Sequence, residues 1–177
     1  MGVNSFWSGR RVFVTGHPGF KGSWLCLWLE KLGADVCAFA LAPQTQPSLY
    51  ECLMSWDNKC HHNGDICDVG TLGAWLAAFA PEIVIHMAAQ ALVRRSYEDP
   101  VGTFATNVQG TVNLLETIRT TPSVRTVLVV TSDKVYANNN YGGRVPGGGV
   151  GRFPCKGGHL RSSGRVRMRT RTWRRRR

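Results

Sequence analysis

The sequence predicts an α/β fold built on a doubly wound parallel β-sheet with helices on both faces. Two observations predict this fold. Short apolar runs rich in β-branched residues alternate with longer segments of helical periodicity from residue 11 to about residue 130, and a glycine-rich turn follows the first of these runs. A third observation limits the extent of the predicted sheet, because the alternation of strands and helices stops near residue 140. We therefore expect the sheet to be incomplete.

The first half of the predicted sheet is a strand-helix-strand unit. Residues Arg11–Thr15 form a β-branched and aromatic run that stops at Gly16, as a buried parallel strand does when it enters a tight turn. Residues 23–32 are rich in Leu and Trp and predict a helix, and the apolar run 35–41 predicts a second strand. Three such elements in about 30 residues indicate a βαβ unit.

The same pattern continues along the chain. Apolar residues of 72–79 fall on one helical face, and the apolar run 83–87 predicts the next strand. Residues 104–118 predict another amphipathic helix, and 127–130 another strand. Each predicted strand after the first is thus reached through a helical crossover, which implies parallel pairing.

Charge divides the chain into two parts. Residues 1–140 hold 10 Lys or Arg and all 11 Asp or Glu, whereas 141–177 hold 12 basic residues and no acid, so the net charge of +11 belongs to the tail. The tail contains 11 Arg and 9 Gly and has no apolar periodicity. We expect residues 1–140 to form a truncated nucleotide-binding domain. The tail should be disordered, or the product of a frameshifted reading frame, and should contact nucleic acid only nonspecifically.

The chain has no pattern of a secreted or membrane protein. Its most apolar stretch, residues 24–32, is short and contains Glu30 and Lys31. No signal peptide is recognisable, and the six cysteines are irregularly spaced. We therefore expect a cytoplasmic protein with reduced thiols. The cysteines are Cys26, Cys37, Cys52, Cys60, Cys67 and Cys155.

Two further groups of polar residues are weaker candidates for sites. One group contains metal-ligand types but no C-x-x-C pair, so no metal site is predicted. Its members are Cys60, His61, His62 and Cys67. The other group, Arg94 and Arg95, could approach a substrate phosphate or simply lie in a solvated loop.

The glycine-rich turn is G-x-x-G-x-x-G, formed by Gly16, Gly19 and Gly22 between the first strand and the first helix. Glycines at this place let the backbone turn sharply and approach a pyrophosphate, which the helix N-terminus attracts. A purely structural turn is the alternative. In this context we expect a Rossmann-like dinucleotide site. The second strand ends in 40–42 (ALA) without the acidic residue that commonly accepts the ribose 2′-OH, so the residues themselves do not select NAD over NADP.

Five motifs in order carry a resemblance over residues 6–140. They are TGHPGFKGSWL (15–25), GDI (64–66), HMAAQ (86–90), N-x-x-G-T (107–111) and TSDKVY (131–136). The chain resembles the extended short-chain dehydrogenase/reductases of the NAD-dependent epimerase/dehydratase family. Its TSDKVY string is most similar to the CDP-glucose 4,6-dehydratases, since relatives that act on dTDP-glucose usually carry Glu in place of Lys134.

This resemblance implies a lyase that converts CDP-glucose to CDP-4-keto-6-deoxyglucose with NAD as a recycled cofactor. It also implies a homodimer, as is common among relatives. The implied cofactor residues fall into three groups along the chain. They are Gly16, Gly19, Phe20, Lys21 and Gly22 at the glycine-rich turn, Asp65 and Ile66 at the adenine, and Met87, Ala88, Ala89, Gln90 and Asn107 toward the nicotinamide.

The implied catalytic residues are Ser132, Asp133 and Lys134. In the mechanism of the family, hydride leaves C4, water is lost across C5 and C6, and hydride returns to C6. Ser132 would hydrogen-bond the C4 oxygen, Asp133 would protonate the leaving hydroxyl and Lys134 would remove the C5 proton. The alternative is a solvated turn, but the triplet directly follows a predicted strand, where ligands of open α/β sheets bind.

One catalytic element of the family is absent from the sequence. Relatives carry a Tyr-x-x-x-Lys pair after the serine, and the tyrosine accepts the proton of the C4 hydroxyl. Here the tyrosines after Ser132 are Tyr136 and Tyr141, and the residues four positions later are Asn140 and Val145. We therefore expect the 177-residue chain to be inactive, and a noncatalytic nucleotide-binding protein is an alternative function.

Overall fold

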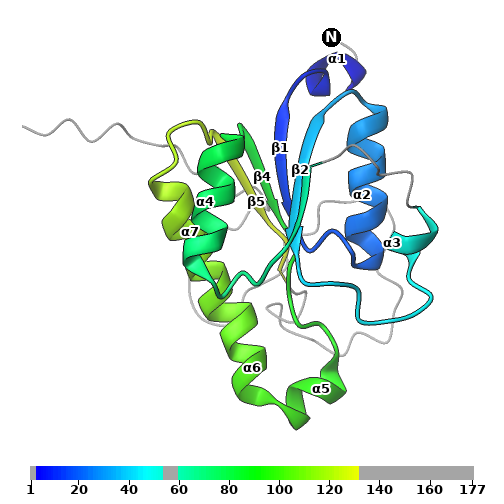
Figure 1. Cartoon of the computed structure of the whole chain (residues 1–177), viewed down its shortest axis with the longest axis vertical. Coiled ribbons are helices and arrows are strands. Elements are labelled where there is room, and N and C mark those ends of the chain that lie inside the picture. The colour runs from blue at the N-terminus through cyan, green and yellow to red at the C-terminus, as the bar shows by residue number, and fades with distance from the viewer. Residues whose placement is uncertain (1–2, 54–59, 132–177) are drawn as a thin grey trace, which may run out of the picture. The chain divides into compact units, whose positions relative to one another are not determined.

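The computed structural model describes residues 3–53 and 60–131. These residues form a sheet of five parallel strands in the order β3-β2-β1-β4-β5 (Figure 1). The strands are β1 (Arg11–Thr15), β2 (Asp35–Ala40), β3 (Cys60–Asn63), β4 (Ile83–His86) and β5 (Thr126–Val129). The sequence order reverses on either side of β1, so the predicted doubly wound α/β fold is confirmed.

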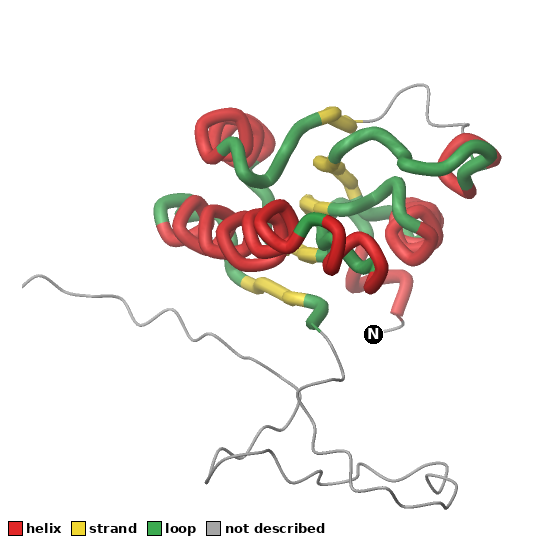
Figure 2. The backbone as a smooth tube through the Cα atoms, turned by 90° about the horizontal axis from the view of Figure 1, so that it is seen from below, coloured by secondary structure: helices red, strands yellow, loops and turns green. Residues whose placement is uncertain are grey.

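Helices cover both faces of this sheet (Figure 1, Figure 2). The helix α2 lies on one face, and α4 and α7 lie on the other. The helical segments are α1 (Val3–Trp7), α2 (Phe20–Lys31), α3 (Leu49–Cys52), α4 (Val69–Phe79), α5 (Val93–Glu98), α6 (Pro100–Phe104), the π-helical η1 (Ala105–Gln109) and α7 (Gly110–Arg119). Within the described ranges, none of these is long and apolar enough to cross a membrane.

Each face of the sheet has its own hydrophobic core, because successive strand residues point to opposite faces. Val12 and Val14 of β1 pack with Leu29 of α2. The intervening Phe13 packs on the other face against Leu72 and other residues of α4 and α7. The two-sided burial explains why β1 is apolar throughout and does not alternate with polar residues.

The structure contains elements that the periodicity did not predict. Strand β3 is the polar run CHHN and lies at the edge of the sheet, where alternate residues stay exposed. The predicted helix 104–118 is instead a succession of α6, η1 and α7. A π-helical segment inserts an extra residue into a helical ladder, and such segments are frequent at functional sites.

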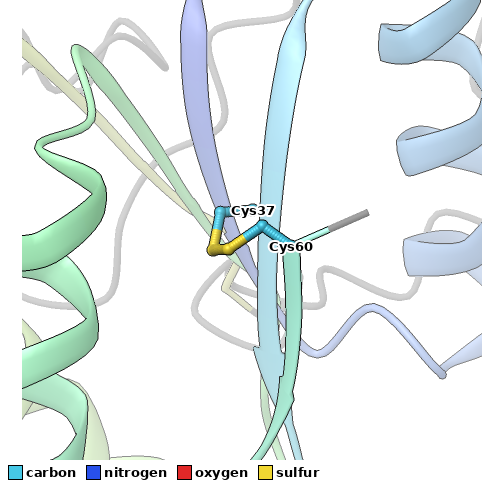
Figure 3. Close-up of a disulfide and its surroundings, with 2 residues drawn as sticks. All are labelled: Cys37 and Cys60. Atoms are coloured by element: carbon cyan, nitrogen blue, oxygen red, sulfur yellow. A yellow bond between two sulfur atoms is a disulfide. The ribbon is translucent and has the colours of Figure 1, made fainter. Parts of the chain in front are cut away.

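The expectation of reduced thiols is wrong for one pair of cysteines. Cys37 and Cys60 form a disulfide between β2 and β3 (Figure 3). The parallel register places these two residues directly opposite each other, with their Cα atoms 4.5 Å apart, which is within the range that a disulfide spans. Their spacing in the sequence did not reveal this pairing, because the strand β3 was not predicted.

Candidate functional site

A cavity of about 880 Å³ lies at the carboxyl ends of the strands. Its walls come from the segments that follow β1, β2, β3 and β4, together with residues of α5, α6 and η1. Open α/β sheets bind their ligands at the carboxyl ends of their strands, and the volume of this cavity suits a large organic cofactor. The lining includes Gly16, Gly19, Phe20, Leu41, Gln44, Asp65, Ile66, Met87, Ala88, Gln90 and Arg95.

The glycine-rich turn is closely packed against the backbone around it. Gly16 has a φ of +80°, and a Cβ on it would lie 2.6 Å from the backbone nitrogen of Ala88. A Cβ on Gly22 would overlap the carbonyl oxygen of Gly16. Gly19, by contrast, has only that same oxygen nearby, at 3.3 Å, and it lines the cavity. The first and third glycines thus allow the turn to form, and the second leaves open space for a ligand.

The N-terminus of α2 lies at the wall of the cavity. Gly19 is its N-cap residue, and no side chain accepts a hydrogen bond from the first turn at this cap. The first backbone N–H groups of a helix have no partner within the helix, and the helix dipole adds a partial positive charge. Gly19 and Phe20 line the cavity beside them. These features fit the pyrophosphate of a dinucleotide.

Behind the cavity, Thr15 and His86 join the ends of β1 and β4. The Thr15 hydroxyl accepts hydrogen bonds from the backbone N–H groups of Met87 and Ala88, both at 3.2 Å. Its oxygen also lies 2.6 Å from Nδ1 of His86. Since two N–H groups occupy the hydroxyl's lone pairs, its proton is directed to His86. Thr15 therefore holds the backbone of Met87 and Ala88 in place at the cavity wall.

The other side of the His86 ring continues this network. Nε2 lies 3.0 Å from the Thr111 hydroxyl, which itself donates to the carbonyl of Asn107 at 2.8 Å. The arrangement selects the neutral tautomer with its proton on Nε2, because Nδ1 accepts from Thr15. Burial lowers the pKa of His86, since the charged ring would be poorly solvated here.

Asn107 fixes the backbone of the loop after β4. Its side-chain amide donates to the carbonyl of Gln90 at 3.0 Å, and its side-chain oxygen accepts from the N–H of Gln90 at 2.8 Å. Asn107 belongs to the π-helical η1. The two hydrogen bonds of the Asn107 side chain thus hold the cavity wall at Gln90, 17 residues earlier in the chain.

Asp65 and Ile66 form the wall after β3. The Asp65 carboxylate accepts from the backbone N–H of Cys67 at 2.9 Å, so it is fixed beside the cavity. Ile66 is 3% exposed and packs tightly against Gly110, on which a Cβ would lie 2.5 Å from the Ile66 side chain. Asn113 donates to the carbonyl of Ile66 at 3.2 Å. The start of α7 therefore supports this wall.

The structure places the sequence-predicted residues as follows. Nine of the twelve predicted cofactor residues line the cavity, and they are Gly16, Gly19, Phe20, Asp65, Ile66, Met87, Ala88, Ala89 and Gln90. Gly22 and Asn107 instead support the turn and the loop, and Lys21 is exposed on the first turn of α2. The predicted catalytic residues Ser132, Asp133 and Lys134 lie outside the described residues, as does the tail 141–177.

Sequence reasoning left the role of the two arginines open, and the structure separates them. Arg95 lines the cavity and donates to the side chain of Gln44 at 3.1 Å. Arg94 pairs with Glu98 at 3.0 Å, and its side chain is 93% exposed. The two arginines are adjacent in sequence but project differently from α5, a helix that the sequence pattern did not predict.

The histidines of β3 belong to an aromatic cluster. His61 stacks on His17 with ring centroids 6.1 Å apart, and Tyr50 meets His17 edge-on at 5.2 Å. His62 stacks on Trp75 at 4.6 Å. Among the described residues, no three His, Cys, Asp or Glu side chains gather in a way that could hold a metal ion.

The pKa of His17 predicts loss of stability in mild acid. Burial, with a smaller contribution from His61, lowers the pKa of His17 from 6.5 to about 4. The unfolded chain therefore takes up this proton first, and the stability that the neutral ring provides is complete above pH 6.5 and falls as the pH drops toward 4. Between pH 7 and 5 we expect this group to remove about 2 kcal/mol from the free energy of unfolding.

Urea unfolding of the protein and of His17→Gln at several pH values measures this loss. The variant should lose about 2 kcal/mol less than the wild type over the interval from pH 7 to 5. His86 titrates in the same direction in both proteins, so the difference isolates His17. Parallel stability curves for the two proteins would contradict the assignment.

Comparison with known proteins agrees with this geometry. A sequence profile described as the NAD dependent epimerase/dehydratase family matches residues 12–147, which include the glycine-rich turn, β1 from its second residue and the other four strands of the described sheet. The chain belongs to this family. The predicted resemblance is confirmed at this level.

Individual relatives refine the comparison. The chain is 53% identical over 137 residues to the CDP-glucose 4,6-dehydratase of Salmonella typhimurium, covering 77% of this chain and the N-terminal 38% of that protein. It is 38% identical over 112 residues to the UDP-glucose 4-epimerase of Mycolicibacterium smegmatis, covering 62% of this chain and 34% of that protein. The chain thus spans under two fifths of the length of these relatives.

Solved structures of relatives share the fold. The UDP-glucose 4-epimerase of Brucella ovis in complex with NAD superposes with a TM-score of 0.62 at 30% identity, over 73% of this chain and 38% of that one. The UDP-glucose-4-epimerase of Stenotrophomonas maltophila, with bound NAD and formylated UDP-arabinopyranose, gives a TM-score of 0.66 at 26% identity, over 75% of this chain and 40% of that one.

Proposed function

We propose that the protein binds NAD in the cavity and provides the cofactor-binding part of a CDP-glucose 4,6-dehydratase. The observation that carries this proposal is the cradle at the end of β1. Two glycines there have no room for a Cβ, and a third opens the N-terminus of α2 to the cavity. The 53% identity to a CDP-glucose 4,6-dehydratase supports the choice of substrate class.

The residues of the cradle have distinct tasks in this proposal. The N-terminus of α2 at Gly19 receives the pyrophosphate, and Asp65 with Ile66 flanks the adenine at the end of β3. The wall of Met87 and Ala88, held by Thr15, lies on the side of the nicotinamide. When bound, NAD supplies reversible hydride transfer.

The remaining chemistry is assigned to residues that follow β5. Ser132 would hydrogen-bond the C4 oxygen of the sugar, Asp133 would protonate the departing C6 hydroxyl and Lys134 would remove the C5 proton. Strands β4 and β5 are neighbours in the sheet. Met87 directly follows β4 in the sequence, and the triplet follows β5. We propose that the 177-residue chain by itself completes no dehydration, because its sequence has no Tyr-x-x-x-Lys pair after Ser132.

A substitution at Gly19 tests the proposed NAD site. Asp at an N-cap stabilises a helix, and Gly19 has an extended φ of −66° and ψ of 156° that Asp adopts readily. Gly19→Asp should therefore keep the fold while its carboxylate occupies and repels the pyrophosphate position. We expect its NAD affinity, measured by isothermal titration calorimetry, to fall at least about 100-fold, whereas its melting temperature stays the same or rises.

The control for NAD affinity is Gly9→Asp, the same change just before the amino end of β1, where no atom lies within 4 Å of the added Cβ. Its φ of +68° makes any Cβ strained, so this control is compared in NAD affinity and not in melting temperature. This control should bind NAD as the wild type does. Equal NAD affinity of Gly19→Asp and wild type, or no NAD binding by the folded wild type, would refute the proposed site. Incubation with CDP-glucose and NAD is expected to yield no keto sugar, and turnover by the 177-residue chain would overturn that part of the proposal.

A further inference from the structure

The cavity wall that follows β2 carries no carboxylate. Strand β2 ends at Ala40, and the residues of the following segment that line the cavity are Leu41, Ala42, Pro43, Gln44, Thr45, Pro47, Ser48 and Leu49. Enzymes of this architecture that use NAD commonly have Asp or Glu here, which accepts a hydrogen bond from the ribose 2′-OH. Such a carboxylate also repels a 2′-phosphate. The end of β2 therefore lacks the group that would exclude NADP.

A positive charge takes its place on the same wall. Arg95 of α5 donates from Nη1 to the side-chain oxygen of Gln44 at 3.1 Å, which ties its guanidinium to the loop after β2. Both residues line the cavity. In the described part of the chain, Arg95 is the only Lys, Arg or His that does so. One N–H is used by Gln44, and the others remain to bind a phosphate oxygen.

The acidic residues that line the cavity do not belong to the segment after β2, and each already accepts a backbone hydrogen bond. Asp65 follows β3 and accepts from the N–H of Cys67 at 2.9 Å. Asp99 follows α5 and accepts from the N–H of Gly102 at the start of α6, at 2.8 Å. Neither carboxylate hydrogen-bonds the guanidinium of Arg95, which donates to Gln44 instead. The charge of Arg95 is thus not neutralised by an ion pair with either of them.

We propose that Arg95, held by Gln44, binds the 2′-phosphate of NADP, so that this protein binds NADP at least as tightly as NAD. The proposal rests on the dinucleotide site proposed above. It assigns to the loop after β2 and to α5 the discrimination between the two cofactors. A guanidinium contacts phosphate through two parallel N–H···O bonds, and such charge-assisted bonds are about twice as strong as neutral ones.

Calorimetric titration of the 177-residue chain with NAD and with NADP tests this proposal. The wild type should bind NADP with a Kd no larger than that for NAD. Arg95→Gln should weaken NADP binding at least about tenfold more than NAD binding, because it removes a charge-assisted contact that only NADP makes. The matched control is Arg94→Gln, which makes the same change of charge one residue away, at a side chain that pairs with Glu98.

The outcomes separate this proposal from the one on which it rests. If NAD binds and the Kd for NADP is larger than that for NAD, the proposal for Arg95 is refuted and the NAD site stands. If neither cofactor binds, both proposals fail. If Arg95→Gln and Arg94→Gln change the ratio of the two affinities equally, the preference is a general charge effect and the assignment to Arg95 is wrong. Thermal melts of both variants check that each remains folded.

Discussion

Gly16→Ala is expected to lower the free energy of unfolding by at least about 4 kcal/mol, which is a large part of the stability of a small domain. Two costs add. The φ of +80° is strained for any residue with a Cβ, at about 1 to 2 kcal/mol. The added methyl would also lie 2.6 Å from the backbone nitrogen of Ala88 and 2.7 Å from the carbonyl carbon of Met87. Backbone atoms held by Thr15 cannot move away without breaking that network.

Urea unfolding followed by circular dichroism measures this loss, and Gly9→Ala is the control. Gly9 also has a positive φ, +68°, but no atom lies within 4 Å of its added Cβ. The control carries the backbone strain alone, so it should cost about 1 to 2 kcal/mol. If both variants lose the same stability, the close contact with Ala88 has no energetic weight and our account of the turn is wrong.

Thr15→Val is expected to cost about 2 to 4 kcal/mol of stability. Valine has nearly the shape of threonine but no hydroxyl, so Nδ1 of His86 and the N–H of Ala88 lose the partner that the structure gives them. The N–H of Met87 keeps a second acceptor, the carbonyl of Thr15 at 3.1 Å. Nδ1 of His86 is left unsatisfied in a buried position, at about 1 to 3 kcal/mol, and the partly exposed N–H of Ala88 adds about 1 kcal/mol.

Thr15→Ser is the matched variant, because it keeps the hydroxyl and loses only a methyl group. We expect it to cost about 1 kcal/mol, less than Thr15→Val, although valine preserves more of the buried volume. Chemical denaturation of the three proteins at pH 7 compares them. A larger loss for the serine variant would show that packing at this position outweighs the hydrogen bonds.

The sequence predicted most of the sheet, and the reason is physical. The runs that became β1, β2 and β4 are apolar because these parallel strands are buried on both faces, and this signal is local. The run that became β5 is apolar as well, although β5 is the other edge strand of the described sheet and its residues are exposed or half-buried. Strand β3 gave no such signal. Its residues CHHN are polar because an edge strand is half exposed, and its pairing with β2 depends on the register of a strand 23 residues away.

The same distinction applies to the site. The glycine-rich turn was predicted because its three glycines lie within seven residues between a strand and a helix, so local chain geometry decides its shape. The sequence did not predict that Arg95 lines the cavity, since its position there depends on a hydrogen bond to Gln44, which is 51 residues away in the chain. No periodicity records which of two adjacent arginines on a short helix faces a cavity.

Composition, strand pattern and ordered motifs by themselves determined that this protein has a doubly wound α/β fold, a dinucleotide-type turn and membership of the epimerase/dehydratase family. Only the tertiary structure decided that Cys37 meets Cys60, that Thr15 and His86 hold the wall at Met87, and that Arg95 of α5 lines the cavity bound to Gln44 of the loop after β2. Local patterns follow from burial and backbone geometry over a few residues. Contacts between distant segments depend on how the sheet orders its strands, which no short stretch of sequence contains.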